Sequence, residues 1–116
     1  MSPVVKATSI GTLLQTAMVV VGHFAPALAE AGLFPIGGTL IGLVTGWLAG
    51  SGSARSSTGA TAVTGGVAGG VAGVLGSLVS TALGDVPLSN VAIAGGSTFV
   101  TGAIGAVVRR SRGAVR

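Results

Sequence analysis

The sequence predicts an all-α membrane protein built from four antiparallel transmembrane helices. Hydrophobic residues make up 49% of the 116 residues, charged residues make up only 7%, and mean hydropathy is +0.90. A soluble domain carries about 25% charged residues, so this chain has too few to cover a surface that faces water. Four uncharged stretches are long enough to cross a membrane, and the charges that separate them alternate in sign along the chain.

The composition also excludes several other classes of protein. Disordered chains combine low hydrophobicity with high charge, which is the reverse of this sequence. The chain has no cysteine, which removes disulfide scaffolds, thiolate metal sites and cysteine nucleophiles. Its 22 glycines lack the every-third-residue repeat of collagen.

The four stretches approach the roughly 20 apolar residues that a membrane-crossing helix requires. We expect spans at about residues 9–28, 34–50, 60–83 and 88–108, none of which contains Asp, Glu, Lys or Arg. Short connections rich in Gly, Pro, Ser or Asp separate them, as is typical of helix ends and turns. Such short links make consecutive helices antiparallel neighbours in a single four-helix domain. Strands of a membrane barrel would instead alternate in polarity, and these stretches do not.

The charges predict an orientation. Lys6, Arg55 and the arginines after the fourth span fall on one side of the membrane, whereas Glu30 and Asp85 fall on the other. Because basic residues are enriched in cytoplasmic segments, both termini are expected in the cytoplasm, with the chain in the inner membrane.

A signal peptide is the alternative interpretation of the first span. Lys6 would supply its basic start, and Ala27-Leu28-Ala29 an A-x-A-like cleavage site before Glu30. Cleavage there would leave three spans, so we expect a retained first span.

Glycines at four-residue spacing form rows along the predicted helices. Residues four apart lie one above another, so each row leaves a flat groove that a second helix can approach closely. The rows are Gly38, Gly42, Gly46 and Gly50 in the second span, Gly65, Gly69 and Gly73 in the third, and Thr98, Gly102 and Ala106 in the fourth.

These rows leave two interpretations open. They pack the four helices of one chain, or one row faces outward and joins subunits. The third span has small residues on almost every side, with Gly66 and Gly70 beside its main row and Gly76 and Ser80 extending that face. Protein on two of its faces is therefore expected, which favours an oligomer or a place in a larger membrane complex.

Polar side chains in the first span form a possible intramembrane site. Thr12, Thr16 and His23 lie on roughly one helical face, with Gln15 beside them. Intramembrane ionisable groups usually face the bundle interior. We expect a neutral His23 bonded to a neighbouring carbonyl or hydroxyl, with a proton, ion, haem or metal role as the alternative. Pro26 is expected to kink or end the helix.

The ends of the spans carry residues suited to the membrane interface. Trp47 and Phe34 are typical of interfacial anchors. Ser89 or Asn90 is expected to cap the fourth helix. The basic residues are expected to set topology and to attract anionic lipid headgroups, and they are Arg55, Arg109, Arg110 and Arg112. Nucleic-acid binding is not expected, because this short tail lacks interleaved aromatic residues.

The sequence offers no catalytic set. Glu30 and Asp85 both lie in predicted loops, and no acid or nucleophile is evident beside His23. No metal-ligand spacing occurs, and no phosphate-binding glycine motif follows a strand. We therefore predict no enzyme activity, no catalytic residues, no metal and no cofactor.

From residue 41 onward the chain resembles the small transglycosylase-associated membrane protein family. The segment Gly42-Leu43-Val44-Thr45-Gly46-Trp47-Leu48-Ala49 is similar to that family's glycine-rich first span. A polar loop, a Gly/Ala/Val span over residues 65–76 and an ending at residues 105–110 also fit its pattern. The resemblance covers about 75 residues and omits the first span. It implies a small inner-membrane protein without catalytic residues.

The functional expectation is a structural or accessory membrane subunit. Its partners would be the lipid bilayer and either further copies of itself or other membrane proteins. The alternative is a small channel, transporter or holin-like pore former that uses the polar face of the first span. A pore normally needs rings of charge or carbonyls, and the sequence supplies no such charge.

Overall fold

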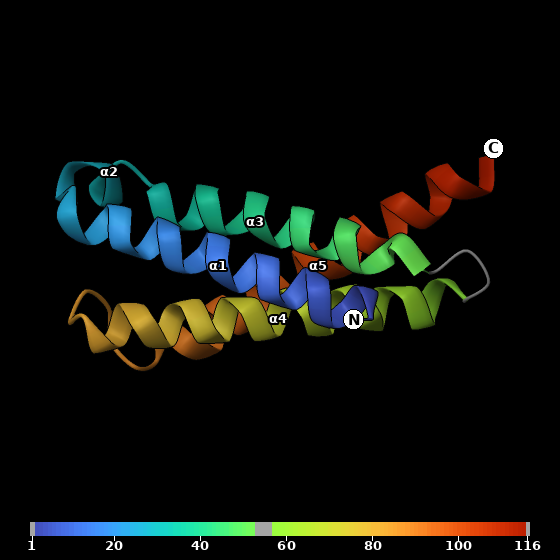
Figure 1. The fold of residues 1–116 in the computed structure, drawn as a ribbon. Helices are drawn as coiled ribbons and strands as arrows, with labels where there is room; N and C mark the ends of the chain where they lie inside the picture. The colour runs from blue at the N-terminus through green and yellow to red at the C-terminus, as the bar shows by residue number, and fades with distance from the viewer. Residues whose placement is uncertain (1, 53–56, 116) are drawn as a thin grey trace.

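The computed structural model describes residues 2–52 and 57–115 as helices joined by short turns (Figure 1). The helices are α1 (Pro3–Phe24), α2 (Pro26–Glu30), α3 (Leu33–Ala49), α4 (Thr58–Ala82) and α5 (Asn90–Val115), with a 3₁₀ turn η1 at Gly50–Gly52. No strand occurs among these residues, which confirms the all-α class.

Three of the helices are long and apolar enough to cross a membrane, as expected of a membrane protein. They are α1, α4 and the part of α5 that covers Asn90–Arg112. Helix α3 is apolar but shorter, at 17 residues, and it takes the place of the second span expected over residues 34–50. Gly32, which has a positive φ, precedes α3, and the 3₁₀ turn η1 follows it. These two turns limit the length of the helix.

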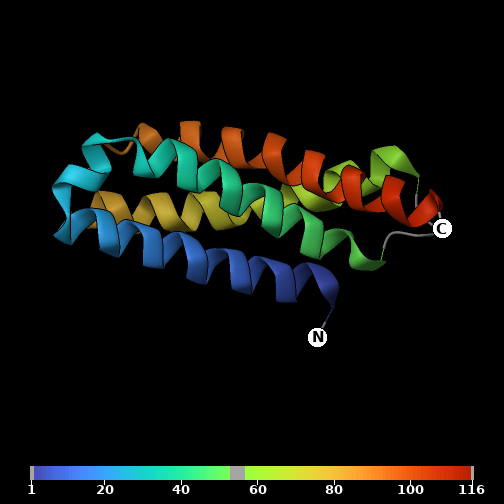
Figure 2. The same cartoon turned by 90° about the horizontal axis from the view of Figure 1, so that it is seen from above.

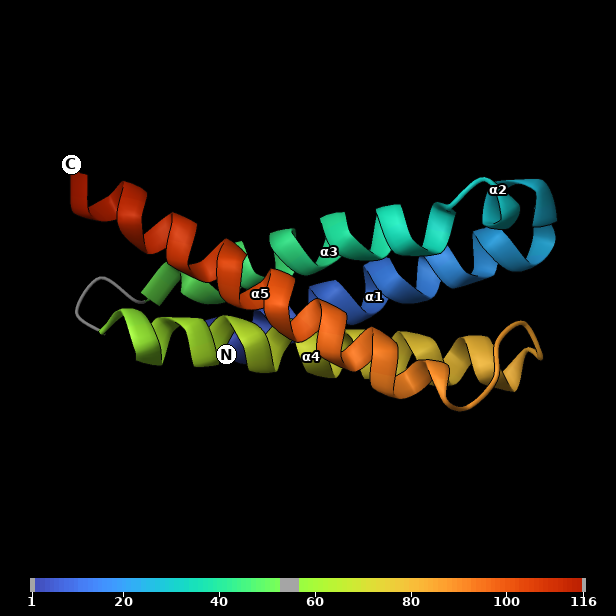
Figure 3. The same ribbon diagram turned by 180° about the vertical axis from the view of Figure 1, so that it is seen from behind.

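The long helices form an elongated bundle of 44 × 23 × 21 Å. Seen from above, α3 lies between α1 and α5 (Figure 2). Helices α3 and α4 pack against each other, and each of them also packs against α1 and α5. Helices α1 and α5 do not contact each other. Helix α5 runs beside α4 at the α2 end of the bundle and crosses toward α3 at the other end (Figure 3).

Local sequence determines where the first helix begins and ends. The Ser2 side chain accepts a hydrogen bond from the Val5 amide at 3.2 Å, and Pro3 occupies the first turn, where its missing N–H costs nothing. At the other end Ala25 leaves the helical region, with φ −129° and ψ 74°, and Pro26 starts α2. The helix break expected at Pro26 is confirmed, and it ends α1 at Phe24, four residues before the predicted span end.

The centre of the bundle is a contact between backbones. Added side-chain carbons at Gly46 of α3 and at Gly65 of α4 would both overlap the carbonyl oxygen of Gly102 in α5. A Cβ at Gly69 would overlap the Thr98 carbonyl in the same way. Three helices therefore meet where none of them has a side chain.

Most of the other ladder glycines also face helices of the same chain. A Cβ would meet the Thr101 side chain at Gly42, the Ala106 backbone at Gly50 and the Thr98 side chain at Gly73. Gly38 differs, because the nearest atom to its Cβ would be the Met18 methyl at 4.0 Å. Three glycines of this row, Gly42, Gly46 and Gly50, therefore pack against α5, and Gly38 does not.

The further small residues of α4 have neighbours within the chain as well. Gly66 lies against the Phe99 ring, and Gly76 lies against Gln15 of α1. Helix α4 therefore packs against α5 with one face and against α1 with another.

The central contact predicts a sharp difference between two glycine-to-alanine variants. Gly46→Ala should lower the free energy of unfolding by about 1–3 kcal/mol, because the methyl group must displace the Gly102 carbonyl. Gly96→Ala is the matched control, since a Cβ there meets nothing within 4 Å, and it should be neutral or slightly stabilising. Denaturant titration in detergent measures both, and equal effects would contradict the backbone contact.

Candidate functional site

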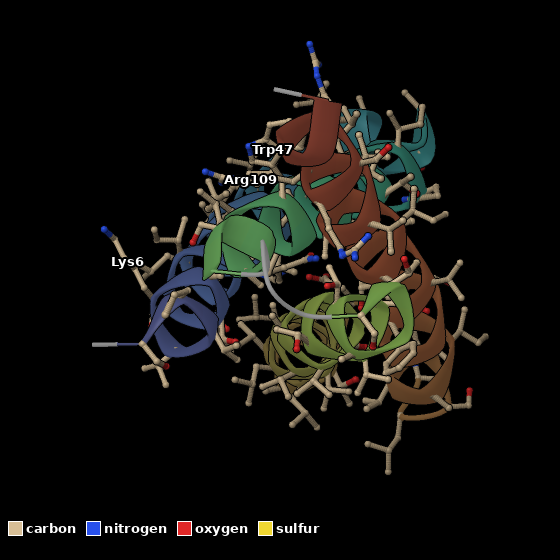
Figure 4. The ribbon with its side chains drawn as sticks, turned by 90° about the vertical axis from the view of Figure 1, so that its right-hand side faces the viewer. Lys6, Trp47 and Arg109 are labelled. Carbon is tan, nitrogen blue, oxygen red and sulfur yellow. The ribbon has the colours of Figure 1, made fainter. Side chains whose placement is uncertain are left out.

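The charged residues of the described chain gather at the two ends of the bundle. We call one end acidic, because it holds Glu30 and Asp85 beside His23. We call the other basic, because it holds Lys6 and the arginines of α5 (Figure 4). Arg55, which was also predicted at the basic end, lies outside the described residues. The candidate site occupies the acidic half of the bundle.

At the acidic end, His23 pairs with Asp85. Its Nδ1 lies 3.0 Å from each carboxylate oxygen of Asp85, in the turn between α4 and α5. The two side chains are 33% and 25% exposed. A carboxylate only accepts hydrogen bonds, so Nδ1–H is the donor. The pair ties the last turn of α1 to the α4–α5 turn.

This pairing corrects the expectation for His23. The sequence predicts a carbonyl or hydroxyl partner for His23 at membrane depth and indicates no acid beside it. Because α1 ends at Phe24, His23 lies in its last turn, at the same end as the Asp85 turn. The predicted topology already places Asp85 at this end of the bundle. The contact was not predicted because the first span was expected to continue to residue 28, which would put His23 deeper in the membrane.

The other polar residues of α1 do not gather around His23. Gln15 is 4% exposed and lines a cavity, whereas Thr12, Thr16 and His23 lie outside that cavity. Thr12 is half-buried and its hydroxyl has no hydrogen-bond partner in the described structure. Of the four residues of the predicted site, Gln15 alone lines this cavity.

The cavity has a volume of about 240 Å³ and lies between the acidic halves of α1, α3, α4 and α5. It opens where α5 diverges from α3, next to Gly38, the ladder position that α5 does not cover. Polar groups from four helices line it, and they are Gln15, Thr39, Ser77, Ser80, Asn90, Ser97 and Thr98.

Some of these polar groups bond to one another and others do not. The Asn90 amide donates to the Ser77 hydroxyl at 3.0 Å, so its side chain joins α5 to α4 where a helix cap was expected. The Thr98 hydroxyl donates to the Ala94 carbonyl at 2.6 Å. In the described structure, the Gln15 Nε2 and the Ser80 Oγ are buried without a partner. These two atoms are buried behind the cavity wall and do not face its open space.

Most of the residues that line this cavity are not predicted as site residues by the sequence. Ser80 and Thr98 were interpreted only as small members of packing faces. The i, i+3 spacing of Ser77 and Ser80 places two hydroxyls on one face of α4, which is the signal that would have indicated a polar lining.

At the basic end, Arg109 performs a structural role. Its Nη1 donates to the Trp47 carbonyl at 3.0 Å, and its guanidinium lies 5.4 Å from the centre of the Trp47 ring (Figure 4). Trp47 O is among the last carbonyls of α3, where cations are favourable. Arg110 donates to the Thr58 hydroxyl at 3.1 Å, and Arg112 is exposed. Arg109 and Arg110, which were predicted to attract lipid headgroups, therefore also join α5 to α3 and to α4.

In comparisons with protein families, curated proteins and solved structures, nothing matches this chain. Among the described residues, no three His, Asp or Glu side chains cluster closely enough to hold a metal ion.

The His23–Asp85 pair predicts a measurable coupling between two substitutions. In a double-mutant cycle, His23→Gln and Asp85→Asn should show a coupling of about 0.2–1 kcal/mol in the free energy of unfolding, the range for exposed pairs. The control cycle combines His23→Gln with Glu30→Gln at the same end and should show none. A coupling of zero in both cycles would rule out the pair in solution.

Proposed function

We propose that the protein is a four-span protein of the inner membrane, with both termini in the cytoplasm. The separation of charge along the bundle supports this orientation. The 44 Å long axis exceeds the roughly 30 Å of a hydrocarbon core, so both charged ends reach the headgroup regions. With 17 residues, α3 lies at the short end of the range for a spanning helix.

Within that membrane we propose a structural or accessory role rather than catalysis. The observation that carries this proposal is the lateral surface, which is apolar on every helix. Leu13 is 70% exposed, Ile36 63% and Ile93 66%, and such side chains suit contact with lipid or other membrane proteins. The transglycosylase-associated resemblance of residues 41–112 supports the same role. The exposed Arg112 suits anionic headgroups.

A second candidate is a small channel or transporter, and the cavity favours it. The cavity is a pocket with several polar lining residues, and it reaches partway through the bundle. The contact of Gly46 and Gly65 with the Gly102 carbonyl lies between this pocket and the basic end. A continuous path would require these backbones to separate, so this candidate ranks second.

The proposed topology is tested with two single cysteines in a chain that has none of its own. Ser51→Cys and Ser89→Cys both replace exposed serines with a side chain of similar size. An impermeant maleimide applied to intact cells should label Cys at position 89 and should reach position 51 only after lysis. Labelling of both from the same side would contradict the four spans.

The accessory role is tested by extracting the protein from its native membrane in a mild detergent. We expect a particle larger than the 10.9 kDa chain that contains other membrane proteins at fixed ratio. Size-exclusion chromatography with light scattering gives the mass, and mass spectrometry gives the composition. A particle of this chain alone would contradict the accessory role and favour the channel.

A further inference from the structure

We propose that the cavity is the open form of a clamp between two helical hairpins, and that α3 and α5 close it by packing Gly38 against Ser97 and Ala94. The first hairpin consists of α1 and α3 with the short α2 between them, and the second consists of α4 and α5. Closure shuts the mouth of the cavity between α3 and α5. It rests on the fold, so it applies to the accessory role and to the channel alike.

Each hairpin is held together within itself at the acidic end. In the first hairpin, an added Cβ at Gly22 of α1 would overlap the Phe34 ring of α3. In the second hairpin, the Asn90 amide of α5 donates to the Ser77 hydroxyl of α4 at 3.0 Å. At this end α1 lies with α3 and α4 lies with α5 (Figures 1 and 3). Each hairpin can therefore move as one body.

One edge between the two hairpins is joined at the acidic end, and the other edge is open. On the joined edge, a Cβ at Gly76 of α4 would lie 2.7 Å from the Gln15 Cβ of α1. The His23 Nδ1 and the Asp85 carboxylate, 3.0 Å apart, connect the same two hairpins. On the other edge, the cavity separates the acidic halves of α3 and α5. The joined edge can therefore act as the hinge while α3 and α5 approach each other.

In the basic half, α3 and α5 already pack in a constant register. An added Cβ at Gly46 would overlap the Gly102 carbonyl, and one turn further along both helices a Cβ at Gly50 would lie 3.1 Å from the Ala106 Cα. The bond from Arg109 to the Trp47 carbonyl also holds the two helices together there. These contacts confine the movement to the acidic half.

The same register continues into the acidic half, where the contact is missing. A Cβ at Gly42 would overlap the Thr101 side chain, and four residues earlier on both helices Gly38 corresponds to Ser97. Gly38, Ser97 and Ala94 all line the cavity, and the atom nearest to an added Cβ at Gly38 is 4.0 Å away. Because all three residues are small, the helices can approach as closely here as they do at Gly42.

Opposing effects act on the two forms. In lipid, helices attract each other mainly through close packing and weak Cα–H···O contacts, and closure adds one more turn of such contacts between α3 and α5. Thr39 and Ser97 are exposed at the mouth, and hydration of these hydroxyls favours the open form. Rocking of two helical units against each other is also how membrane transporters open and close a pocket.

The closed register is tested with pairs of cysteines in a chain that has none of its own. Gly38→Cys is combined with Ala94→Cys in the full chain, purified in a mild detergent and oxidised with copper phenanthroline. A disulfide requires Cα atoms about 4.4–6.8 Å apart, so the two helices must meet across the cavity to form it. We expect an intramolecular disulfide in most molecules, measured by intact-mass spectrometry after alkylation of the remaining thiols.

The control pair combines Gly38→Cys with Ala92→Cys. Ala92 is exposed on the same helix, two residues from Ala94, and does not line the cavity. Closure in the proposed register keeps this position away from α3, so the control pair should stay reduced under the same conditions.

A second measurement follows closure without trapping it. Ser97→Cys is labelled with a maleimide, and the rate reports the open fraction because closure packs this position against α3. Gly38→Val should hold the clamp open, since its side chain has room in the open form and would meet Ser97 in the closed one. We expect labelling about threefold faster or more, which corresponds to a parent chain closed for about two-thirds of the time. Labelling of Ala92→Cys should not respond to Gly38→Val.

Either of two results would overturn the closure. One is a disulfide yield for the Gly38–Ala94 pair no higher than that of the control pair. The other is a labelling rate at Ser97→Cys that Gly38→Val leaves unchanged, which would make the cavity a fixed feature of the bundle. Failure of the accessory role would appear only in the composition of the native particle and would leave both results unchanged.

Discussion

The backbone contact at Gly102 is the constraint on which the rest of the bundle depends. In lipid, apolar side chains gain little by leaving their surroundings, so helices must attract one another through close packing and weak Cα–H···O contacts. Gly46 and Gly65 approach the same carbonyl from two other helices. This arrangement joins α3, α4 and α5 at one place, and α1 then packs on α3 and α4.

The same contact explains the shape of the acidic half. Helix α5 is held against both α3 and α4 near Gly102, and toward the acidic end it follows α4 and leaves α3. The wedge between α3 and α5 becomes the polar cavity, beside Gly38. The tight packing near Gly102 and the open cavity toward the acidic end therefore both result from the way α5 crosses α3.

The sequence predicts the helices well because their signals are local. Long apolar stretches, Pro26 and the glycine turns identify the elements without knowledge of their packing. The contacts between helices are harder to predict from the sequence. Gly38 and Gly42 have the same spacing and the same apparent role, yet only Gly42 meets α5, because the crossing angle decides which turns touch. Likewise, the His23–Asp85 contact depends on where α1 stops within the bundle and on which turn lies next to it.

The late position of Gly102 in the chain has a consequence for biosynthesis. Chains are made from the N-terminus, so α1, α3 and α4 precede the segment that supplies the shared carbonyl. Until α5 enters the membrane, Gly46 and Gly65 lack the partner that brings them together. A nascent chain that stops before α5 therefore leaves both glycine surfaces without the backbone against which they pack.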